Sequence, residues 1–204
     1  MTDAERLARL RDLPLNYDPA APHRAEDGWR FDAYCEPLPP EPPGAPLPDG
    51  SFAVARDLLR NYRVADPRMV RATYDRDAPL EHRDMLLELR FGPLRLHAGC
   101  RTGTITDQRR EVDGRPAHVW GWPYMTLQGH VEQGQMDWEV WKWLDTGEVE
   151  FHVHAFSRNA HARNPVINLG FKLVGQFERR RYLRSACARM ARFTAEALER
   201  PPGI

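Results

Sequence analysis

The chain has 204 residues, of which 42% are hydrophobic and 28% are charged, proportions typical of a soluble globular protein. Basic and acidic residues number 29 each, so the formal net charge is zero and gives no reason to expect a nucleic acid as partner. Three cysteines without a Cys-x-x-Cys motif predict free thiols in a reducing cytoplasm. No stretch is long enough to span a membrane, and the charged N-terminus is unlike a secretory signal.

The first 50 residues are expected to form an extension that begins with a short helix within residues 3–12. The stretch "EPLPPEPPGAPLPDG" (36–50) excludes a helix or central strand, because proline lacks the backbone N–H and fixes φ. We interpret it as an extended segment on the domain surface, with a disordered linker as the alternative. Trp29, Phe31 and Tyr34 precede it and indicate that this part is held in place.

Residues 49–64 predict a helix with Ser51 or Asp49 as its cap. A run of strands follows, with a short strand after residue 66 and a break at Gly92-Pro93. Asp113-Gly114 is typical of a tight hairpin turn, and "LDTGEV" (144–149) is a second turn. Residues 149–156 alternate apolar and polar side chains, as a strand with two different faces does.

Residues 164–200 predict one long helix, with Asn164 as N-cap and Pro165 at the first helical position. Its apolar stripe consists of Leu169, Leu173, Phe177, Tyr182, Ala186, Met190, Phe193 and Ala197. The run Arg179 to Arg181 is interpreted as part of a solvated, ion-paired face, because adjacent residues on a helix point in different directions.

The order of elements predicts an α+β fold, in which a curved antiparallel β-sheet wraps around a long C-terminal helix. We expect a single domain over 1–204. It comprises the N-terminal extension with its proline-rich segment (1–50), a helix and sheet (51–163) and the long helix (164–200).

Four segments occur in an order that resembles a bacterial and plant family of unknown function: "LPLNYDP", "YMTLQGHVEQG", "AFSRNAHARNP" and "QFERRRYLRSACARM". The middle block is similar to the pattern Tyr-Gly-Thr-Leu-Pro-Gly-His, from which Met125 and Gln128 depart. The family is grouped with the START and Bet v I-like helix-grip folds. The resemblance therefore implies a cavity between sheet and helix, and hydrophobic small molecules or lipids as ligands.

The hairpin closed by "DTG" predicts a strand register in which Leu144 pairs with Glu148 and Lys142 with Glu150. That register places aromatic residues and two carboxylates on one sheet face, which suits a ligand pocket. The alternative is a plain core with the carboxylates exposed at the sheet's end. The residues expected to bind ligand are Trp120, Trp122, Tyr124, His130, Asp137, Glu139, Trp141, Trp143 and Phe151.

Two His-containing pairs, His130-x-Glu132 and His152-x-His154, have spacing that suits metal ligands but is common by chance in a chain with eight histidines. No metal and no cofactor is predicted. His130 and Glu132 also suit acid–base chemistry, with the imidazole as a general base. The alternative is that both side chains shape the loop by bonding to its backbone, while Gly129 and Gly134 supply unusual φ values.

The leading hypothesis is a binding protein for a hydrophobic or aromatic small molecule. A cyclase- or hydrolase-type enzyme that uses His130 as base in the same cavity is the first alternative. A structural or interaction domain without an open cavity is the second.

Overall fold

The computed structural model describes residues 2–92, 94–160 and 165–199, apart from the side chains of residues 91 and 165–176. The helices are α1 (Asp3–Ala8), the 3-10 turn η1 (Ala25–Asp27), α2 (Ser51–Arg60) and α3 (Pro165–Leu198). The strands are β1 (Arg30–Leu38), β2 (Val70–Thr73), β3 (Asp84–Phe91), β4 (Leu94–Thr102), β5 (Thr106–Val112), β6 (Arg115–Thr126), β7 (Glu132–Trp143) and β8 (Val149–Asn159).

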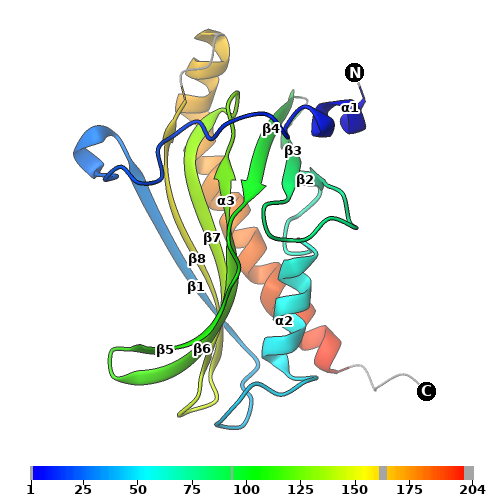
Figure 1. Cartoon of the computed structure of the whole chain (residues 1–204), viewed down its shortest axis with the longest axis vertical. Helices are drawn as coiled ribbons and strands as arrows, with labels where there is room; N and C mark the ends of the chain where they lie inside the picture. Colours follow the sequence, from blue (N-terminus) through cyan, green and yellow to red (C-terminus); the bar gives the residue numbers. More distant parts are fainter. Residues whose placement is uncertain (1, 93, 161–164, 200–204) are drawn as a thin grey trace.

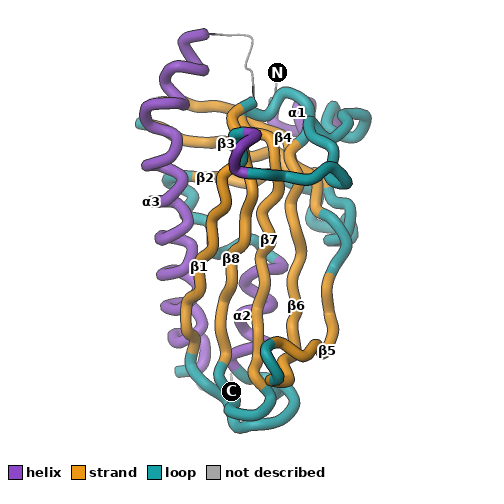
Figure 2. Tube along the Cα trace, turned by 90° about the vertical axis from the view of Figure 1, so that its left-hand side faces the viewer, coloured by secondary structure: helices purple, strands orange, loops and turns teal. Residues whose placement is uncertain are grey.

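The described strands form one curved antiparallel sheet in the order β1-β8-β7-β6-β4-β3-β2. Strand β6 is shared, because most of its length pairs with β5 while its last residues pair with β4. Helices α2 and α3 pack on the concave side of this sheet (Figures 1 and 2). The predicted α+β fold with a long C-terminal helix is therefore confirmed.

Local turn signals in the sequence correspond to turns in the structure. Strand β3 ends at Phe91, directly before the predicted break, and β4 begins at Leu94. Asp113 and Gly114 both have positive φ, at 51° and 76°, and close the predicted hairpin between β5 and β6. Gly129, in the loop before β7, and Gly134, near the start of that strand, have the predicted unusual φ values of 91° and 142°.

Strand β1 lies inside the segment that the sequence analysis assigns to the N-terminal extension. It pairs along its whole length with β8, so residues 30–38 are the edge strand of the sheet. Its exposed face carries Phe31 and Cys35, while its inner face carries Asp32 and Glu36 together with Tyr34 and Leu38, so neither face shows the usual binary pattern. The strand is therefore difficult to recognise from its pattern alone.

The predicted register of the β7–β8 hairpin is wrong by one residue. Lys142 lies opposite Val149 and Trp141 opposite Glu150, while Trp143 N donates to Glu148 O at 2.9 Å. The turn holds one residue more than predicted because the Leu144 backbone bonds elsewhere. Its N–H donates to Pro116 O at 2.9 Å, and its carbonyl accepts from Gly44 N at 2.8 Å.

The one-residue shift exchanges the two faces of β7, since side chains alternate along a strand. Trp138 and Val140 now point inward together with Trp120 and Trp122 of β6. Trp138 stacks on Phe151 of β8, with ring centroids 5.9 Å apart. This aromatic cluster fills the space between the middle of the sheet and the helices.

Helix α2 is capped in a way that differs from the prediction. Its N-cap is Gly50, and neither Ser51 nor Asp49 caps it with a side chain. Glu41 takes that role, because its Oε1 accepts the Phe52 N–H at 2.8 Å. A Cβ on Gly50 would lie 2.4 Å from the same oxygen, which explains the glycine. The proline-rich segment is thus bonded to the domain through Glu41.

Helix α3 spans the predicted length, and its described inner face includes Tyr182, Ala186 and Met190. Phe177, assigned to the same stripe, is 67% exposed. The cap at Asn164 lies outside the described residues, as do the side chains of Pro165, Leu169 and Leu173.

Candidate functional site

The structure divides the nine residues predicted to bind ligand among three places. The aromatic core holds Trp120, Trp122 and Phe151. The outer face of the sheet carries Asp137, Glu139, Trp141 and Trp143. A cavity is lined by Tyr124 and His130. The predicted single wall is therefore wrong, because it depends on the incorrect register.

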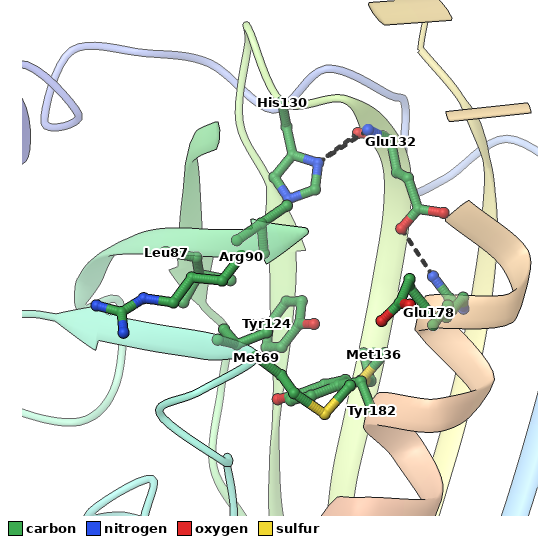
Figure 3. A pocket seen from close by; sticks show the side chains of 12 residues that line it. Met69, Leu87, Arg90, Tyr124, His130, Glu132, Met136, Glu178 and Tyr182 are labelled. Atoms are coloured by element: carbon green, nitrogen blue, oxygen red, sulfur yellow. Dashed lines mark hydrogen bonds and ion pairs between the residues drawn. The ribbon is translucent and has the colours of Figure 1, made fainter. Parts of the chain in front are cut away.

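The cavity has a volume of about 70 Å³ and lies between the end of the sheet and α3 (Figure 3). Its apolar lining consists of Met69, Val70, Leu87, Leu89 and Met136. Its polar lining consists of Arg90, Tyr124, His130, Glu132, Glu178, Arg179 and Tyr182. In this shape the cavity has room for a few water molecules or a small chemical group. A larger ligand requires the walls to move apart.

Two tyrosines from different elements form one wall of the cavity. Tyr182 of α3 shares a 2.7 Å hydrogen bond between hydroxyls with Tyr62, which follows α2. Tyr124 of β6 lines the same cavity (Figure 3). Burial raises the pKa of Tyr124 and of Tyr182 above the ordinary value, so both are neutral hydrogen-bond donors at physiological pH.

His130 lies in the loop before β7, and its ring points into the cavity (Figure 3). Its Nδ1 contacts the Glu132 backbone, 2.9 Å from the nitrogen and 3.0 Å from the carbonyl oxygen, and its Nε2 faces the cavity. Burial lowers the pKa of His130 to about 4, so the imidazole is neutral at pH 7.

Glu132 and Arg179 form the charged edge of the cavity. Arg179 Nη1 donates to Glu132 Oε2 at 2.9 Å, and its Nε donates to Asp32 Oδ2 of β1 at 2.8 Å. Arg30 adds a second cation 3.4 Å from Glu132 Oε1. Burial alone lowers the pKa of Arg179, but the two carboxylates outweigh it and raise the net value. The positive charges of Arg179 and Arg30 are therefore balanced by the carboxylates of Glu132 and Asp32.

Arg179 is the cavity residue that sequence reasoning missed, since it was assigned to a solvated face together with Arg180 and Arg181. Its side chain is only 12% exposed. The available signal was its spacing, because Arg179 lies three residues before Tyr182 and seven before Ala186, on the buried face of α3. Asp32 had no such signal, since β1 itself was not predicted.

A family model described as "Domain of unknown function (DUF1990)" matches residues 17–185. The chain belongs to the DUF1990 family. The matched region includes β1 to β8 and the part of α3 that carries Arg179 and Tyr182. No curated protein sequence matches this DUF1990 member significantly.

A solved structure shares the helix-grip fold of this DUF1990 member. Norcoclaurine synthase from Thalictrum flavum, a point mutant in complex with a transition state analogue, superimposes with a TM-score of 0.51. That match has 8% identity and covers 84% of this chain and 97% of the synthase chain, so it shows the fold alone. TTHA0849 from Thermus thermophilus matches with a TM-score of 0.47 and 9% identity, covering 83% of this chain and 98% of that one.

Among the helices that the structure describes, none is long and apolar enough to cross a membrane.

Proposed function

We propose that the protein binds a small, largely apolar molecule in the cavity between its sheet and α3. The observation that carries this proposal is a pair of neutral polar groups, the His130 imidazole and the Tyr124 hydroxyl, beside the Met and Leu side chains of one cavity. Such a combination of apolar walls with a few placed polar groups is typical of ligand pockets.

The polar groups define the chemistry of the ligand. A hydroxyl or carbonyl group of the ligand forms hydrogen bonds with His130 and Tyr124, while its hydrocarbon or aromatic part contacts Leu87 and Met136. Met69 and Met136 supply flexible side chains that adapt to ligands of different shape. The neighbouring Arg179 is neutralised by two carboxylates, which favours an uncharged ligand.

The enzyme alternative needs a lone pair on His130 Nε2 to accept a proton from substrate. A pKa of about 4 makes the imidazole a weak base at pH 7, which favours binding over turnover. The cavity likewise favours binding over a domain that acts through its surface alone.

Native mass spectrometry of the purified protein tests the proposal directly, since a co-purified molecule of low polarity is the expected result. A second test titrates the protein with the uncharged fluorescent probe N-phenyl-1-naphthylamine. Met136→Trp fills the cavity and is expected to weaken binding of the probe at least tenfold.

The matched control is Met125→Trp, because Met125 lies on the same sheet but its side chain is outside the cavity. Circular dichroism melting of both variants checks that each remains folded. Equal affinity of the wild type and a folded Met136→Trp variant for the probe would overturn the proposal.

A further inference from the structure

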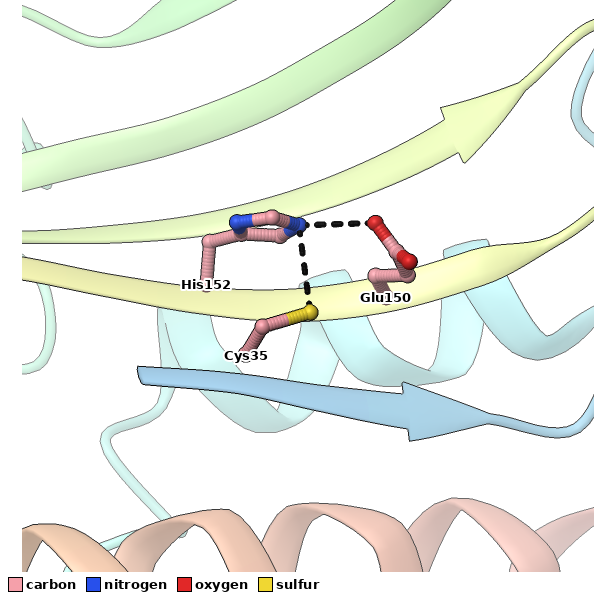
Figure 4. Close-up of side chains that lie close together, drawn as sticks. All are labelled: Cys35, Glu150 and His152. Carbon is pink, nitrogen blue, oxygen red and sulfur yellow. Dashed lines mark hydrogen bonds and ion pairs between the residues drawn. The ribbon is translucent and has the colours of Figure 1, made fainter. Parts of the chain in front are cut away.

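Three side chains with metal-binding atoms meet on the outer face of the sheet, on the opposite side from the cavity. Cys35 of β1 lies directly across from His152 of β8, and Glu150 lies two residues before His152 on the same face (Figure 4). The Cys35 Sγ to His152 Nε2 distance is 3.6 Å, and the His152 Nε2 to Glu150 Oε2 distance is 2.8 Å. One donor atom from each residue lies within 4.8 Å of the others.

This arrangement does not suit a nucleophilic Cys–His–Glu triad. A triad needs the thiol on one imidazole nitrogen and the carboxylate on the other, so that the ring can transfer a proton between them. Here both partners lie against the same atom, Nε2 (Figure 4). Burial and the charge of Glu150 also raise the pKa of Cys35 to about 11, so the free thiol is a poor nucleophile at neutral pH.

Convergence on one point is instead the geometry of a metal site. With bonds of about 2.3 Å to sulfur and about 2.0 Å to nitrogen, a tetrahedral zinc ion separates these two ligand atoms by about 3.5 Å. The observed separation of Cys35 Sγ and His152 Nε2, 3.6 Å, is close to this value. The nitrogen and the carboxylate oxygen must move apart by about half an ångström, which a glutamate side chain can do by rotation.

Neighbouring side chains hold the ligands in orientation. The Trp141 ring stacks on His152 at 4.8 Å between centroids, and the His154 ring lies parallel to it at 5.8 Å. Trp143 Nε1 donates to Glu150 Oε2 at 2.9 Å, as the outer partners of metal ligands commonly do. Cys35 is exposed, so an ion can enter and solvent can provide a fourth ligand.

We propose that Cys35, His152 and Glu150 bind a divalent transition-metal ion, with Zn²⁺ as the preferred ion. The donor set of one sulfur, one imidazole nitrogen and one carboxylate oxygen suits zinc and excludes Ca²⁺ and Mg²⁺, which prefer oxygen ligands alone. Binding replaces the thiol proton, which leaves to solvent. The bound ion joins the edge strand β1 to β8 and thereby stabilises that edge of the sheet.

Titration of untagged protein with Co²⁺ as a spectroscopic substitute for Zn²⁺ tests the site. We expect one equivalent to bind, with a thiolate-to-cobalt charge-transfer band that Zn²⁺ abolishes. Cys35→Ser should remove that band and weaken Zn²⁺ binding at least tenfold, and His152→Gln should weaken binding similarly. Cys100 and Cys187 are buried and do not compete for the ion.

The control is His118→Gln. His118 Nε2 lies 2.8 Å from Asp107 Oδ1, as His152 Nε2 does from Glu150 Oε2, but among the described residues His118 belongs to no cluster of three possible metal ligands. This variant should bind Zn²⁺ as the wild type does. Zn²⁺ should also raise the melting temperature of the wild type and leave that of a folded Cys35→Ser variant unchanged. A cobalt spectrum without the charge-transfer band, or Zn²⁺ affinity that survives Cys35→Ser, would overturn the proposal.

Discussion

Lys142 and Glu41 form an ion pair in the interior of the protein, although 101 residues separate them in the sequence. Neither side chain is appreciably exposed, at 0% for Lys142 and 2% for Glu41. Lys142 Nζ also donates to Ala45 O at 3.1 Å, and Glu41 caps α2 through Phe52 N. The pair therefore connects the sheet, the proline-rich segment and the first long helix.

Lys142→Met should destabilise the protein by about 3–5 kcal/mol, because it leaves the Glu41 carboxylate buried without a counter-charge. Urea unfolding measures this loss. The double variant Glu41→Gln/Lys142→Met removes both charges and should recover a large part of the stability. A single variant that loses less than about 1 kcal/mol, the size of an exposed pair, would contradict the buried role.

The observed register makes different predictions for two tryptophans of β7. Trp138→Ala removes a fully buried ring from the aromatic core and should cost about 3–5 kcal/mol in free energy of unfolding. Trp143→Ala changes a half-buried ring on the outer face and should cost clearly less. The one-residue shifted register predicts the opposite order, so equilibrium unfolding of the two variants distinguishes the registers.

His130 should make stability depend on pH. Its pKa falls from the usual 6.5 to about 4 in the folded protein, so the unfolded chain binds the proton more readily. Its contribution is fully present above pH 6.5 and is lost as the pH falls from 6.5 towards 4. The shift corresponds to a loss on the order of 3 kcal/mol.

His130→Gln isolates this effect from other groups that titrate in the same range. The free energy of unfolding of the wild type should fall more steeply between pH 6.5 and 4 than that of the variant. Parallel curves for the two proteins would show that the folded-state pKa of His130 is not depressed.

Arg179 and Arg180 are adjacent on α3 but should respond differently to substitution. Arg179→Met leaves Glu132 and Asp32 without their shared cation and should destabilise the protein by a few kcal/mol. Arg180→Met alters an exposed side chain and should change stability by about 0.5 kcal/mol or less. Thermal unfolding of both variants checks the prediction, and similar melting temperatures would contradict it.

Local features of the sequence were sufficient to predict most elements of the fold. The β5–β6 hairpin depends on positive φ at Asp113 and Gly114, which their residue types favour. The long helix depends on apolar spacing within one segment, and Tyr182, Ala186 and Met190 are buried as that spacing predicts. Of the residues predicted to bind ligand, Tyr124 and His130 line the cavity; His130 was assigned from the loop before β7, whereas Tyr124 was assigned from the strand pairing.

The sequence by itself determined the type and order of the main elements, because periodicity and turn chemistry are properties of neighbouring residues. Only the tertiary structure decided which face of β7 is buried, because the register depends on Leu144 bonding to Pro116 and Gly44 rather than to β8. It likewise decided that Arg179 reaches Asp32 and that Cys35 meets His152, since both contacts depend on the long-range pairing of β1 with β8. A one-residue shift along a strand exchanges its faces at little local cost, so side-chain alternation alone does not reveal which face is buried.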